Sequence, residues 1–326
     1  MARAFITGAT GQDGTYLTEH LHALGFEVHG LVRAGDPDPA NPDLLTVHHG
    51  DLTDRPGITA LLDEIRPTQI YNLAGLSSVA FCWAEPVLAA EVNGAGAVFL
   101  MEAAWRLQER TGEQVAFVQA ASAEIFGEAD VFPQTEQTPI RPVNPYGASK
   151  AFAHLSAGVY RARGLHASSM ILYNHESPLR PPSFVTRKIT QGAAAIAKGE
   201  ATELRLGNLD ARRDWGWAPD YVAAMALAAA HAEPDDYVIG TGMAHSVRDF
   251  VVAAFTAAGV TDWERYVVQD PTFYRPVDPT ELLADASKAR RELGWSPTLD
   301  FDQLVARMVA VDLDSADATS ARGMPR

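Results

Sequence analysis

The sequence predicts an α/β protein in which a doubly wound parallel sheet is joined to a smaller C-terminal domain. Up to Tyr173, short apolar runs alternate with longer helical patterns, which is typical of βαβ units. Most of these short runs are nearly continuous in apolar residues, as strands covered by helices on both faces are. After Asn174, several prolines interrupt the chain and the alternation stops, so we expect a second domain to begin there.

Each element follows from its local pattern. Strands are expected at Ala4–Thr7, Glu27–Val32, Thr46–His49, Gln69–Leu73, Gln114–Ala120 and Ala167–Tyr173. Helices are expected at Gly14–Leu24, Ile58–Ile65, Pro86–Glu109, Pro145–Arg163, Phe184–Lys198, Asp220–Ala232, Ser246–Ala258 and Phe301–Leu313. The segment Val260–Asp285 is rich in proline, aromatic and charged residues, which is more typical of binding loops than of a core. The last residues, 314–326, have the composition of a flexible tail.

Composition restricts the class of protein. The 326 residues carry a net charge of -15, which argues against binding along nucleic acid or anionic membranes, because phosphate neutralisation needs a basic face. A local arginine or lysine cluster can still bind a small anion. The single cysteine, Cys82, excludes an internal disulfide, and neither a signal peptide nor a long apolar run is evident. We therefore expect a cytoplasmic protein with no nucleic-acid or membrane partner.

A glycine-rich turn follows the first expected strand and opens the first helix. Glycine permits the backbone to approach a pyrophosphate, which then lies at the helix N-terminus. A spaced glycine triplet is weak evidence alone, but its position between a strand and a helix is the one a dinucleotide requires. The expected cofactor-binding residues of this turn are Thr7, Gly8, Gly11, Gln12, Asp13 and Gly14.

The end of the second strand distinguishes NAD from NADP. A carboxylate there binds the ribose hydroxyls of NAD, whereas an arginine accommodates the 2′-phosphate of NADP. The sequence has Arg33 at this place, with Asp36 as the nearest acid. We therefore predict NADP; a solvated surface role for Arg33 is the alternative. Asp51 and Leu52 follow the third strand and are placed to meet the adenine edge, and Asp51 can also cap the next helix.

Three residues predict a dehydrogenase-type site. Tyr146 and Lys150 are four residues apart and share one face of a helix. The lysine ammonium is expected to stabilise the phenolate and lower the pKa of Tyr146, so that the tyrosine acts as a base near neutral pH. Ser122, after the fifth strand, can hydrogen-bond the same substrate hydroxyl. A Tyr-x-x-x-Lys spacing is common by chance, but the three residues occur here in order on a dinucleotide-binding frame.

These motifs resemble extended short-chain dehydrogenases that act on nucleotide sugars. Within that group, three stretches resemble the GDP-mannose 4,6-dehydratase family, from about residue 3 to about residue 313. They are the glycine turn with its Gln12–Asp13 insert, the segment Asn174–Pro178 followed by Phe184–Lys188, and Leu206–Gly216. The resemblance implies a modified Rossmann fold with a smaller substrate-binding domain.

The resemblance also implies a reaction. In the resembled dehydratases, hydride leaves C4 of the sugar and the resulting ketone acidifies the C5 proton. A carboxylate removes that proton while the C6 hydroxyl leaves as water, and hydride returns to C6. Glu124 occupies the place of this carboxylate, two residues after Ser122. An exposed loop glutamate is the alternative, and sugar-nucleotide decarboxylases also have glutamate here. The implied enzyme is a hydro-lyase that converts GDP-mannose to GDP-4-keto-6-deoxymannose with tightly bound, recycled NADP.

The resemblance assigns the remaining site residues and domain limits. The dinucleotide-binding domain comprises residues 1–173 plus about 209–240, and the nucleotide-sugar domain about 174–208 plus 241–313. Further cofactor-binding residues are Leu73, Ala74, Asn174, His175 and Arg180, in addition to Tyr146 and Lys150. Expected substrate-binding residues are Ser77, Glu124, Asn174, Lys188, Leu206, Asn208, Arg213, Arg275 and Asp278. For Lys188 a solvated helix face is the alternative, and for Arg213 an ion pair with Asp214. No spacing of metal-ligand residues is evident, so no metal is expected.

Three departures from the family limit the inference. The segment Ala34–Val47 is short where the family carries a long one that builds a tetramer, so a homodimer is expected. Leu76 and Ser78 replace a glutamine and a histidine near the sugar, which enlarges the pocket and makes a bulkier sugar such as a GDP-heptose conceivable. The loop before Arg275 is short, and Asp278 stands for a glutamate, which weakens the inference to guanine. The sequence also leaves open a nucleotide-sugar epimerase or reductase, and a non-catalytic NADP-binding protein.

Overall fold

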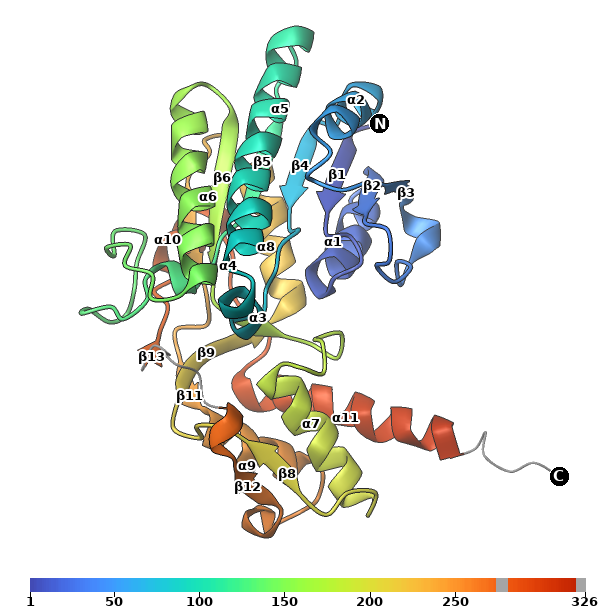
Figure 1. Cartoon of the computed structure of the whole chain (residues 1–326), viewed down its shortest axis with the longest axis vertical. Helices are drawn as coiled ribbons and strands as arrows, with labels where there is room; N and C mark the ends of the chain where they lie inside the picture. The colour runs from blue at the N-terminus through green and yellow to red at the C-terminus, as the bar shows by residue number, and fades with distance from the viewer. Residues whose placement is uncertain (274–280, 321–326) are drawn as a thin grey trace, which may run out of the picture.

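The computed structural model describes residues 1–273 and 281–320, with side chains as far as Asp314 in the last helix. Figure 1 shows an upper part, in which helices cover a large sheet, and a lower part built from helices and short strands. The strands of the large sheet point their carboxyl ends toward the lower part. Loops from both parts therefore meet at this edge, where a doubly wound sheet binds its ligands.

The large sheet confirms the predicted fold class. Its seven strands are all parallel, in the order β10-β6-β5-β4-β1-β2-β3. The strands are β1 (Arg3–Thr7), β2 (Glu27–Val32), β3 (Thr46–His49), β4 (Gln69–Asn72), β5 (Ala116–Ala120), β6 (His166–Leu172) and β10 (Asp236–Ile239). Six agree with the prediction to within two residues at either end. The sequence analysis missed β10, because its short run follows a helix in a region without the βα alternation.

Helices cover both faces of this sheet, as the continuously apolar strands require. One face carries α1 (Gln12–Ala23), α8 (Ala218–Ala230) and α10 (Ser287–Leu293), and the other carries α2 (Arg55–Ile65), α5 (Gly96–Thr111) and α6 (Pro145–Ala162). Phe5 and Phe117 are fully buried between strands and helices. Burying each such side chain stabilises the fold by about 1.5–3 kcal/mol.

A long apolar helix runs through the second of these layers. It is continuous from Pro86 to Thr111 and contains α4 (Pro86–Ala89), a π-helical turn η2 (Ala90–Ala95) and α5. By length and composition alone it can cross a membrane, which the sequence analysis did not recognise. Half of the most apolar stretch of this helix is buried inside the protein, against α2, α6 and the sheet. A core helix of this kind meets the same criteria.

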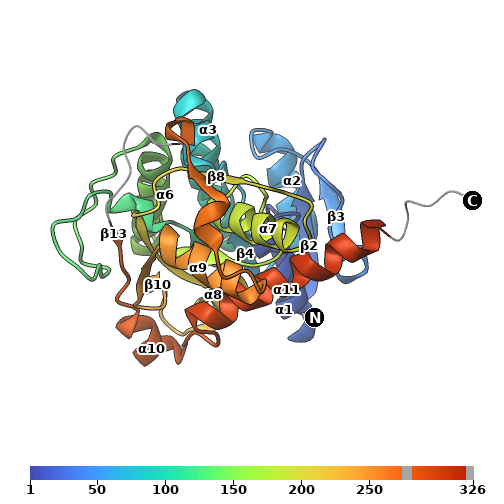
Figure 2. The ribbon, with the colours of Figure 1, turned by 90° about the horizontal axis from the view of Figure 1, so that it is seen from below.

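The lower part has its own hydrophobic core, formed by α7 (Val185–Ala197), α9 (Val247–Ala257) and α11 (Phe301–Ser320). Seen from below, these helices lie across the strand ends of the large sheet (Figure 2). Short strands complete this part: β7 (Asn174–Glu176), β8 (Leu204–Leu206), β9 (Arg212–Trp217), β11 (Ala244–Ser246), β12 (Val267–Gln269) and β13 (Glu281–Leu282). Strand β9 pairs with β7, β11 and β13, whereas α8 and β10 join the large sheet.

The ends of the chain differ from the expectation at one point. The last helix was predicted to end at Leu313, but α11 continues to Ser320, so the first residues of the expected tail are helical. Residues 321–326 lie outside the described residues. The side chain of Asp312 holds α11 to α7 through a buried ion pair with Arg187. The limits of the dinucleotide-binding and nucleotide-sugar domains stay a prediction from the sequence.

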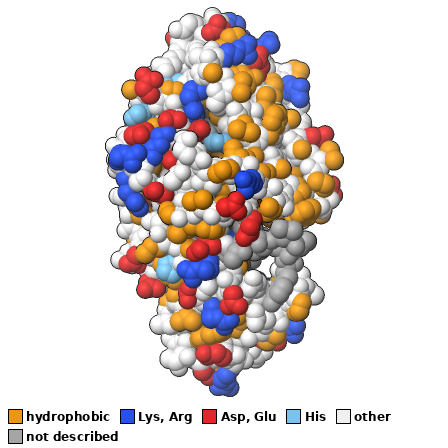
Figure 3. All heavy atoms as spheres, turned by 90° about the vertical axis from the view of Figure 1, so that its left-hand side faces the viewer, with side chains coloured by type: hydrophobic (Ala, Val, Ile, Leu, Met, Phe, Trp, Pro, Cys, Tyr) orange, Lys and Arg blue, Asp and Glu red, His pale blue; other side chains and the backbone are white. Residues whose placement is uncertain are grey.

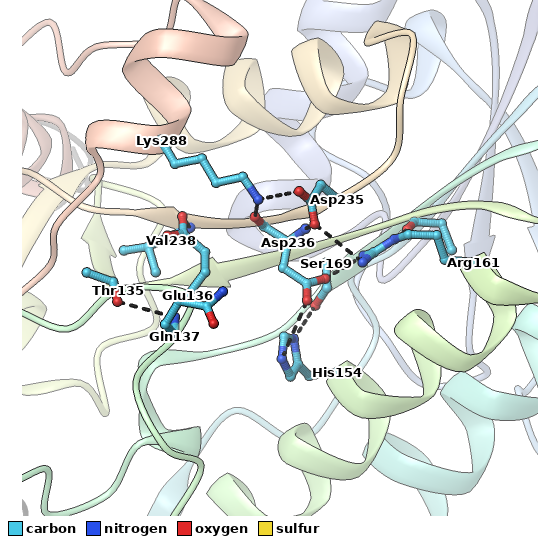
Figure 4. A network of polar contacts seen from close by, with 11 residues as sticks. Thr135, Glu136, Gln137, His154, Arg161, Ser169, Asp235, Asp236, Val238 and Lys288 are labelled. Carbon is cyan, nitrogen blue, oxygen red and sulfur yellow. Dashed lines mark hydrogen bonds and ion pairs between the residues drawn. The ribbon is translucent and has the colours of Figure 1, made fainter.

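A polar network closes the edge of the large sheet near β10 (Figure 4). Arg161 on α6 pairs with Asp235 and Asp236, and Lys288 on α10 pairs with Asp235 and donates to the Asp236 carbonyl at 2.9 Å. His154 bonds Ser169 at 2.9 Å. These contacts attach helices from both faces of the sheet to its last strand, and they lie away from the strand ends that meet the lower part.

Candidate active site

The glycine turn between β1 and α1 is packed so closely that side chains are excluded. A Cβ on Gly14 would lie 2.3 Å from the Gly8 carbonyl oxygen, and Gly8 has a φ of +71° with its own Cβ position 2.9 Å from the Ala74 nitrogen. Gly11 differs, because an added Cβ would meet only the Gly8 oxygen at 3.4 Å. Gly11 is exposed, so the open side of the turn lies there, at the N-terminus of α1.

A buried chain of hydrogen bonds crosses the carboxyl ends of the three central strands. The hydroxyl of Thr7 donates to the Asn72 side chain at 2.8 Å, and the Asn72 amide donates to Gln119 at 2.8 Å. Gln119 donates to the carbonyl of Ala120 at 2.9 Å, and the same carbonyl accepts from the Lys150 ammonium at 2.8 Å. The chain therefore ties the glycine turn to Lys150.

Tyr146 and Lys150 lie on one face of α6, with the ammonium 5.9 Å from the centre of the phenol ring. Burial raises the pKa of Tyr146 to about 12, the hydrogen bond with Ser122 acts in the opposite direction, and the nearby charge of Glu124 adds to the rise. Burial lowers the pKa of Lys150 to about 8. The expected lowering of the Tyr146 pKa is therefore not found in this structure, because desolvation of the phenolate outweighs the contacts that favour it.

Ser122 caps the short helix η3 (Ala123–Ile125) at the end of β5, Glu124 lies within this helix, and both side chains are buried. The Ser122 hydroxyl accepts from the Glu124 backbone amide at 3.3 Å. The Glu124 carboxylate accepts from the Asn144 side chain at 2.8 Å. The predicted catalytic residues Ser122, Glu124, Tyr146 and Lys150 thus come from two adjoining elements, η3 and α6.

A second polar cluster connects the glycine turn to the segment that follows β6. Gln12 donates to the His175 carbonyl at 3.1 Å and accepts from the Ser177 hydroxyl at 2.8 Å, while Asp13 bonds the His175 ring at 2.8 Å. The other ring nitrogen of His175 meets the Tyr173 carbonyl at 2.8 Å, and the ring stacks on Tyr221. These interactions orient His175 and hold two distant segments together, so we name Gln12, Asp13, His175 and Ser177 the turn latch.

The charges of the turn latch are set by its own partners. Burial alone lowers the pKa of His175, but the charge and hydrogen bond of Asp13 together outweigh it and raise the pKa. Burial alone raises the pKa of Asp13, but the charge and hydrogen bond of His175, with the bond from Gln12, hold it below its usual value. The pair is therefore ionised over a wider pH range than either group would be in water.

Asp13→Asn is expected to lower the free energy of unfolding by about 1.5–3 kcal/mol, the range for hydrogen bonds to charged groups. The His175 contribution is complete below its ordinary pKa near 6.5 and is lost as pH rises through the raised value. The Asp13 contribution is complete above about 3.9 and is lost as pH falls through the lowered value. Urea unfolding should show a larger deficit at about pH 6 than at about pH 9. Equal deficits would contradict the ion pair.

Two further predicted residues lie beside this latch. Asn174 begins β7 and is half-buried, and Arg180 follows in the loop before α7. The Arg180 guanidinium lies 3.8 Å from the centre of the Phe184 ring and 3.2 Å from the Glu176 carboxylate. Its charge lowers the pKa of Asp13 and of Tyr146, although other causes are larger in both cases. Arg180 therefore lies near enough to the glycine turn and to Tyr146 for its charge to act on both.

The residues expected at the adenosine end lie at the tips of β2, β3 and β4. Arg33 is exposed and pairs with Asp36 at 3.0 Å. Asp51 accepts two bonds of 2.8 Å from Thr53, which hold its pKa below the usual value, with a smaller contribution from the charge of Arg33. The helix cap considered for Asp51 is wrong, because Asp54 caps α2. Leu52 is buried, and Leu73 and Ala74 are half-buried beside the glycine turn.

The expected substrate residues of the lower part surround α7 and β8. The Lys188 ammonium lies 3.7 Å from the centre of the Phe273 ring, and burial lowers its pKa. Asn208 forms a local turn by accepting from the Asp210 amide at 2.9 Å, and the buried Arg213 donates to the Arg212 carbonyl at 2.7 Å. The Leu206 side chain lies in the core of the lower part. Arg275 and Asp278 lie outside the described residues.

The loop between β4 and α3 (Val79–Ala84) is held from below by Asn93, which lies in the π-helical turn η2. Its side chain accepts from the Leu76 amide at 2.8 Å and donates to the Leu76 carbonyl at 3.1 Å. Ser77 is exposed in this loop, and Ser78 caps α3 by accepting from the Phe81 amide at 3.2 Å. The sequence analysis missed Asn93, although a polar residue within an apolar helix was a usable signal.

The site combines four chemical groups at one corner of the sheet edge. They are the Ser122 hydroxyl, the Tyr146 phenol, the Lys150 ammonium and the Glu124 carboxylate. The first three can take a proton from an alcohol while its carbon loses a hydride, and the carboxylate can remove a second proton nearby. Within the described residues, no group of three or more His, Cys, Asp or Glu side chains is arranged to hold a metal ion.

Comparison with known proteins gives a consistent result. The family model described as GDP-mannose 4,6 dehydratase matches residues 5–308. The chain is 43% identical to GDP-mannose 4,6 dehydratase 1 of Arabidopsis thaliana, over 96% of this chain and 90% of that protein. It is 40% identical to GDP-mannose 4,6 dehydratase of Homo sapiens, over 95% and 91%. Among solved structures, UDP-glucose 4-epimerase of Thermus thermophilus in complex with NAD superimposes with a TM-score of 0.83, 29% identity and coverage of 96% and 99%.

Proposed function

This chain belongs to the GDP-mannose 4,6-dehydratase family, and on that premise we propose that it converts GDP-mannose to GDP-4-keto-6-deoxymannose. The observation that carries the proposal is the position of Glu124 beside the Ser122, Tyr146 and Lys150 group. Oxidation at C4 needs only the latter three. A carboxylate in the same corner supplies the base that dehydration requires in addition.

The residues divide the reaction between them. Ser122 and Tyr146 bind the C4 hydroxyl, and Tyr146, reacting as its phenolate, takes the hydroxyl proton as the hydride leaves C4. Glu124 then removes the C5 proton and returns it to the C6 hydroxyl, which leaves as water. The hydride adds to C6, and C5 takes up a proton that balances the one removed from the C4 hydroxyl. NADP bound at the glycine turn would supply the acceptor and donor for this hydride, so the reaction would have no net oxidation or reduction. Lys150, anchored on the Ala120 carbonyl, contributes positive charge beside the phenol.

The glycine turn fits a dinucleotide. Its Gly8 and Gly14 positions have no room for a Cβ, and its open side at Gly11 adjoins the positive end of α1, where a pyrophosphate is favoured. Asp51 and Leu52 would hold the adenosine, and Asn174, His175 and Arg180 the nicotinamide end. We propose that the cofactor is NADP, because Arg33 provides a cation where a 2′-phosphate would lie. Tight retention of the cofactor is part of this proposal.

Arg33→Ala is expected to weaken NADP binding about tenfold, or about 1.4 kcal/mol, because one charge-assisted contact to the 2′-phosphate is lost. NAD binding should stay within about twofold, since NAD has no phosphate at that position. Titration of cofactor-free enzyme with each nucleotide, followed by tryptophan fluorescence, measures both affinities. An equal loss of affinity for NAD and NADP would show that Arg33 only supports the structure at the end of β2 and does not contact the 2′-phosphate.

Purified protein incubated with GDP-mannose and no added cofactor tests the function itself. We expect a sugar nucleotide lighter by one water in mass spectrometry, without net change in reduced cofactor. Unchanged GDP-mannose, even with added NADP, would overturn the proposal for this sugar. GDP-heptose would then be the next substrate to assay, because Leu76 and Ser78, in the loop between β4 and α3, replace a glutamine and a histidine that the family resemblance places near the sugar. In a parallel incubation with added NADPH, its stoichiometric consumption would instead indicate a reductase.

We propose that the enzyme is a cytoplasmic homodimer. Large apolar side chains are exposed along adjoining helices α3, α4 and α6, namely Phe81, Trp83, Val87, Leu88, Phe152, Leu155 and Val159. Hydrophobic side chains gather along one side of the upper part in Figure 3. Monomeric proteins rarely leave so continuous an apolar face in water, so a second copy of this face is its expected partner.

Leu155→Glu is expected to shift the protein from dimer to monomer, because a charge would be buried at the centre of the apolar face. Light scattering after size-exclusion chromatography measures the mass directly. Leu227→Glu is the matched control, since Leu227 is a similarly exposed leucine on α8, on the opposite face of the sheet. A dimeric Leu155→Glu variant, or an equal effect of the control, would exclude this face as the interface.

A further inference from the structure

Asn144 uses both ends of its side-chain amide, and each end contacts a different part of the site. Its Oδ1 atom accepts from the Gly147 backbone amide at 2.8 Å and so caps the N-terminus of α6. Its Nδ2 atom donates to the Glu124 carboxylate at 2.8 Å. Both side chains are buried, with exposed fractions of 5% for Asn144 and 9% for Glu124.

The backbone brings the same two elements together independently. A Cβ on Gly147 would lie 2.4 Å from the Glu124 carbonyl oxygen, so η3 packs directly against the first turn of α6. The Glu124 amide is bonded to Ser122 on the other side. The backbone of Glu124 is therefore fixed on both sides. The direction of its carboxylate depends on contacts made by the side chain.

A cap alone does not require asparagine. Serine, threonine and aspartate cap helices comparably, because each supplies the acceptor oxygen. Asparagine alone among these capping residues adds an N–H donor held in the same plane as that oxygen. Since Oδ1 is committed to the Gly147 amide, the cap fixes the direction in which Nδ2 points, and that direction is toward Glu124. The two partners also determine the orientation of the amide, because a flipped side chain would oppose donor to donor and acceptor to acceptor.

We propose that Asn144 is a positioning residue for the elimination step, and that its amide aims the Glu124 carboxylate at the C5 proton from the start of the helix that carries Tyr146 and Lys150. This rests on the proposed function, in which Glu124 is the C5 base. Asn144 thereby fixes the position of the Glu124 carboxylate relative to Tyr146, the group that takes the C4 proton. The first hydride transfer does not use Glu124, so Asn144 acts on the second step only.

Asn144→Ser tests the proposal, because serine retains the cap but cannot reach Glu124. We expect product formation to fall about 10- to 100-fold, which is less than the 10²- to 10⁴-fold contribution of a positioned base, because the base is misdirected and not removed. The first hydride transfer, followed as reduced-cofactor absorbance after rapid mixing, should stay within about twofold, so that reduced cofactor accumulates. The KM for the sugar nucleotide should be unchanged. Deuterium exchange from solvent into C5 should slow together with product formation.

Asn144→Asp provides a second readout that a structural role would not move. It keeps the cap but places a carboxylate against Glu124, so it is expected to be less active than Asn144→Ser at neutral pH. Protonation of the introduced carboxyl group restores a donor. The activity of this variant relative to wild type should therefore rise as pH falls from about 8 to about 6.

The outcomes separate this inference from the proposed function. Wild-type product formation in Asn144→Ser, or an equal slowing of hydride transfer and product formation, would overturn the positioning role, the second result by showing a disturbed α6. Glu124→Gln is run beside it. If Glu124→Gln is inactive in elimination and Asn144→Ser is normal, only the role of Asn144 fails. If Glu124→Gln also turns over normally, the assignment of Glu124 fails and the role of Asn144 falls with it.

Discussion

Tyr146→Phe is expected to lower turnover of GDP-mannose by about 10²- to 10⁴-fold, the contribution of a positioned acid–base group. The phenol is the group placed to take the C4 proton, and its hydrogen bond with Ser122 orients it for the same hydroxyl. Without the phenol, nothing takes the proton of the C4 hydroxyl, so a neutral ketone cannot form when the hydride leaves C4. The first step should therefore fail, and rapid mixing of the variant with substrate should show no reduced-cofactor absorbance.

The fold and the binding surfaces should survive this change. Tyr146 is half-buried in the first turn of α6, whose cap is formed by Asn144 and not by the phenol. Cofactor retained through purification and an unchanged dissociation constant for GDP-mannose are the controls. Reduced cofactor that appears at the wild-type rate in Tyr146→Phe would remove this residue from the proton transfer.

Glu124→Gln is expected to lose product formation by about 10²- to 10⁴-fold while keeping the first hydride transfer. The amide has the shape of the carboxylate but cannot accept the C5 proton. The enzyme should therefore stop after C4 oxidation, with reduced cofactor and a 4-keto sugar nucleotide held in the site. Stopped-flow absorbance and mass spectrometry of the quenched mixture measure the two steps separately.

A second consequence concerns the phenol. The charge of Glu124 contributes to the raised pKa of Tyr146, after burial as the main cause. Removing that charge should lower the pKa of Tyr146 and move the pH dependence of the first hydride transfer toward lower pH. Normal dehydration by Glu124→Gln would eliminate the carboxylate mechanism, and an unshifted pH profile would show that the two groups are electrostatically independent.

The order of elements could be predicted because it depends on local sequence. Continuous apolar runs identify strands buried on both faces, and the glycine turn identifies the junction of β1 and α1. Short elements escaped this reasoning, including β10, α3 and α10. Strand β10 belongs to the large sheet only because it pairs with β6, a contact between residues 169–172 and 236–239 that no local pattern encodes.

The site shows the same division. The sequence analysis named Ser122, Tyr146 and Lys150 from their order and spacing and Glu124 from the family resemblance, and the structure brings them to adjoining elements at one corner of the sheet. It missed the groups that orient them, because Asn144 and Gln119 act through contacts with residues distant in the chain. The direction of the Tyr146 pKa was also wrong, since it depends on how much solvent the fold removes.

The sequence by itself determined the α/β class, the position of the glycine turn and the residue types expected at the site. These depend on patterns within a few residues, where periodicity and backbone preference act directly. Only the tertiary structure decided which groups touch: Asp13 with His175, Asn144 with Glu124, and the Ala120 carbonyl with Lys150. Each of these contacts joins segments that are far apart in the chain, so its geometry and electrostatics arise only when the core packs.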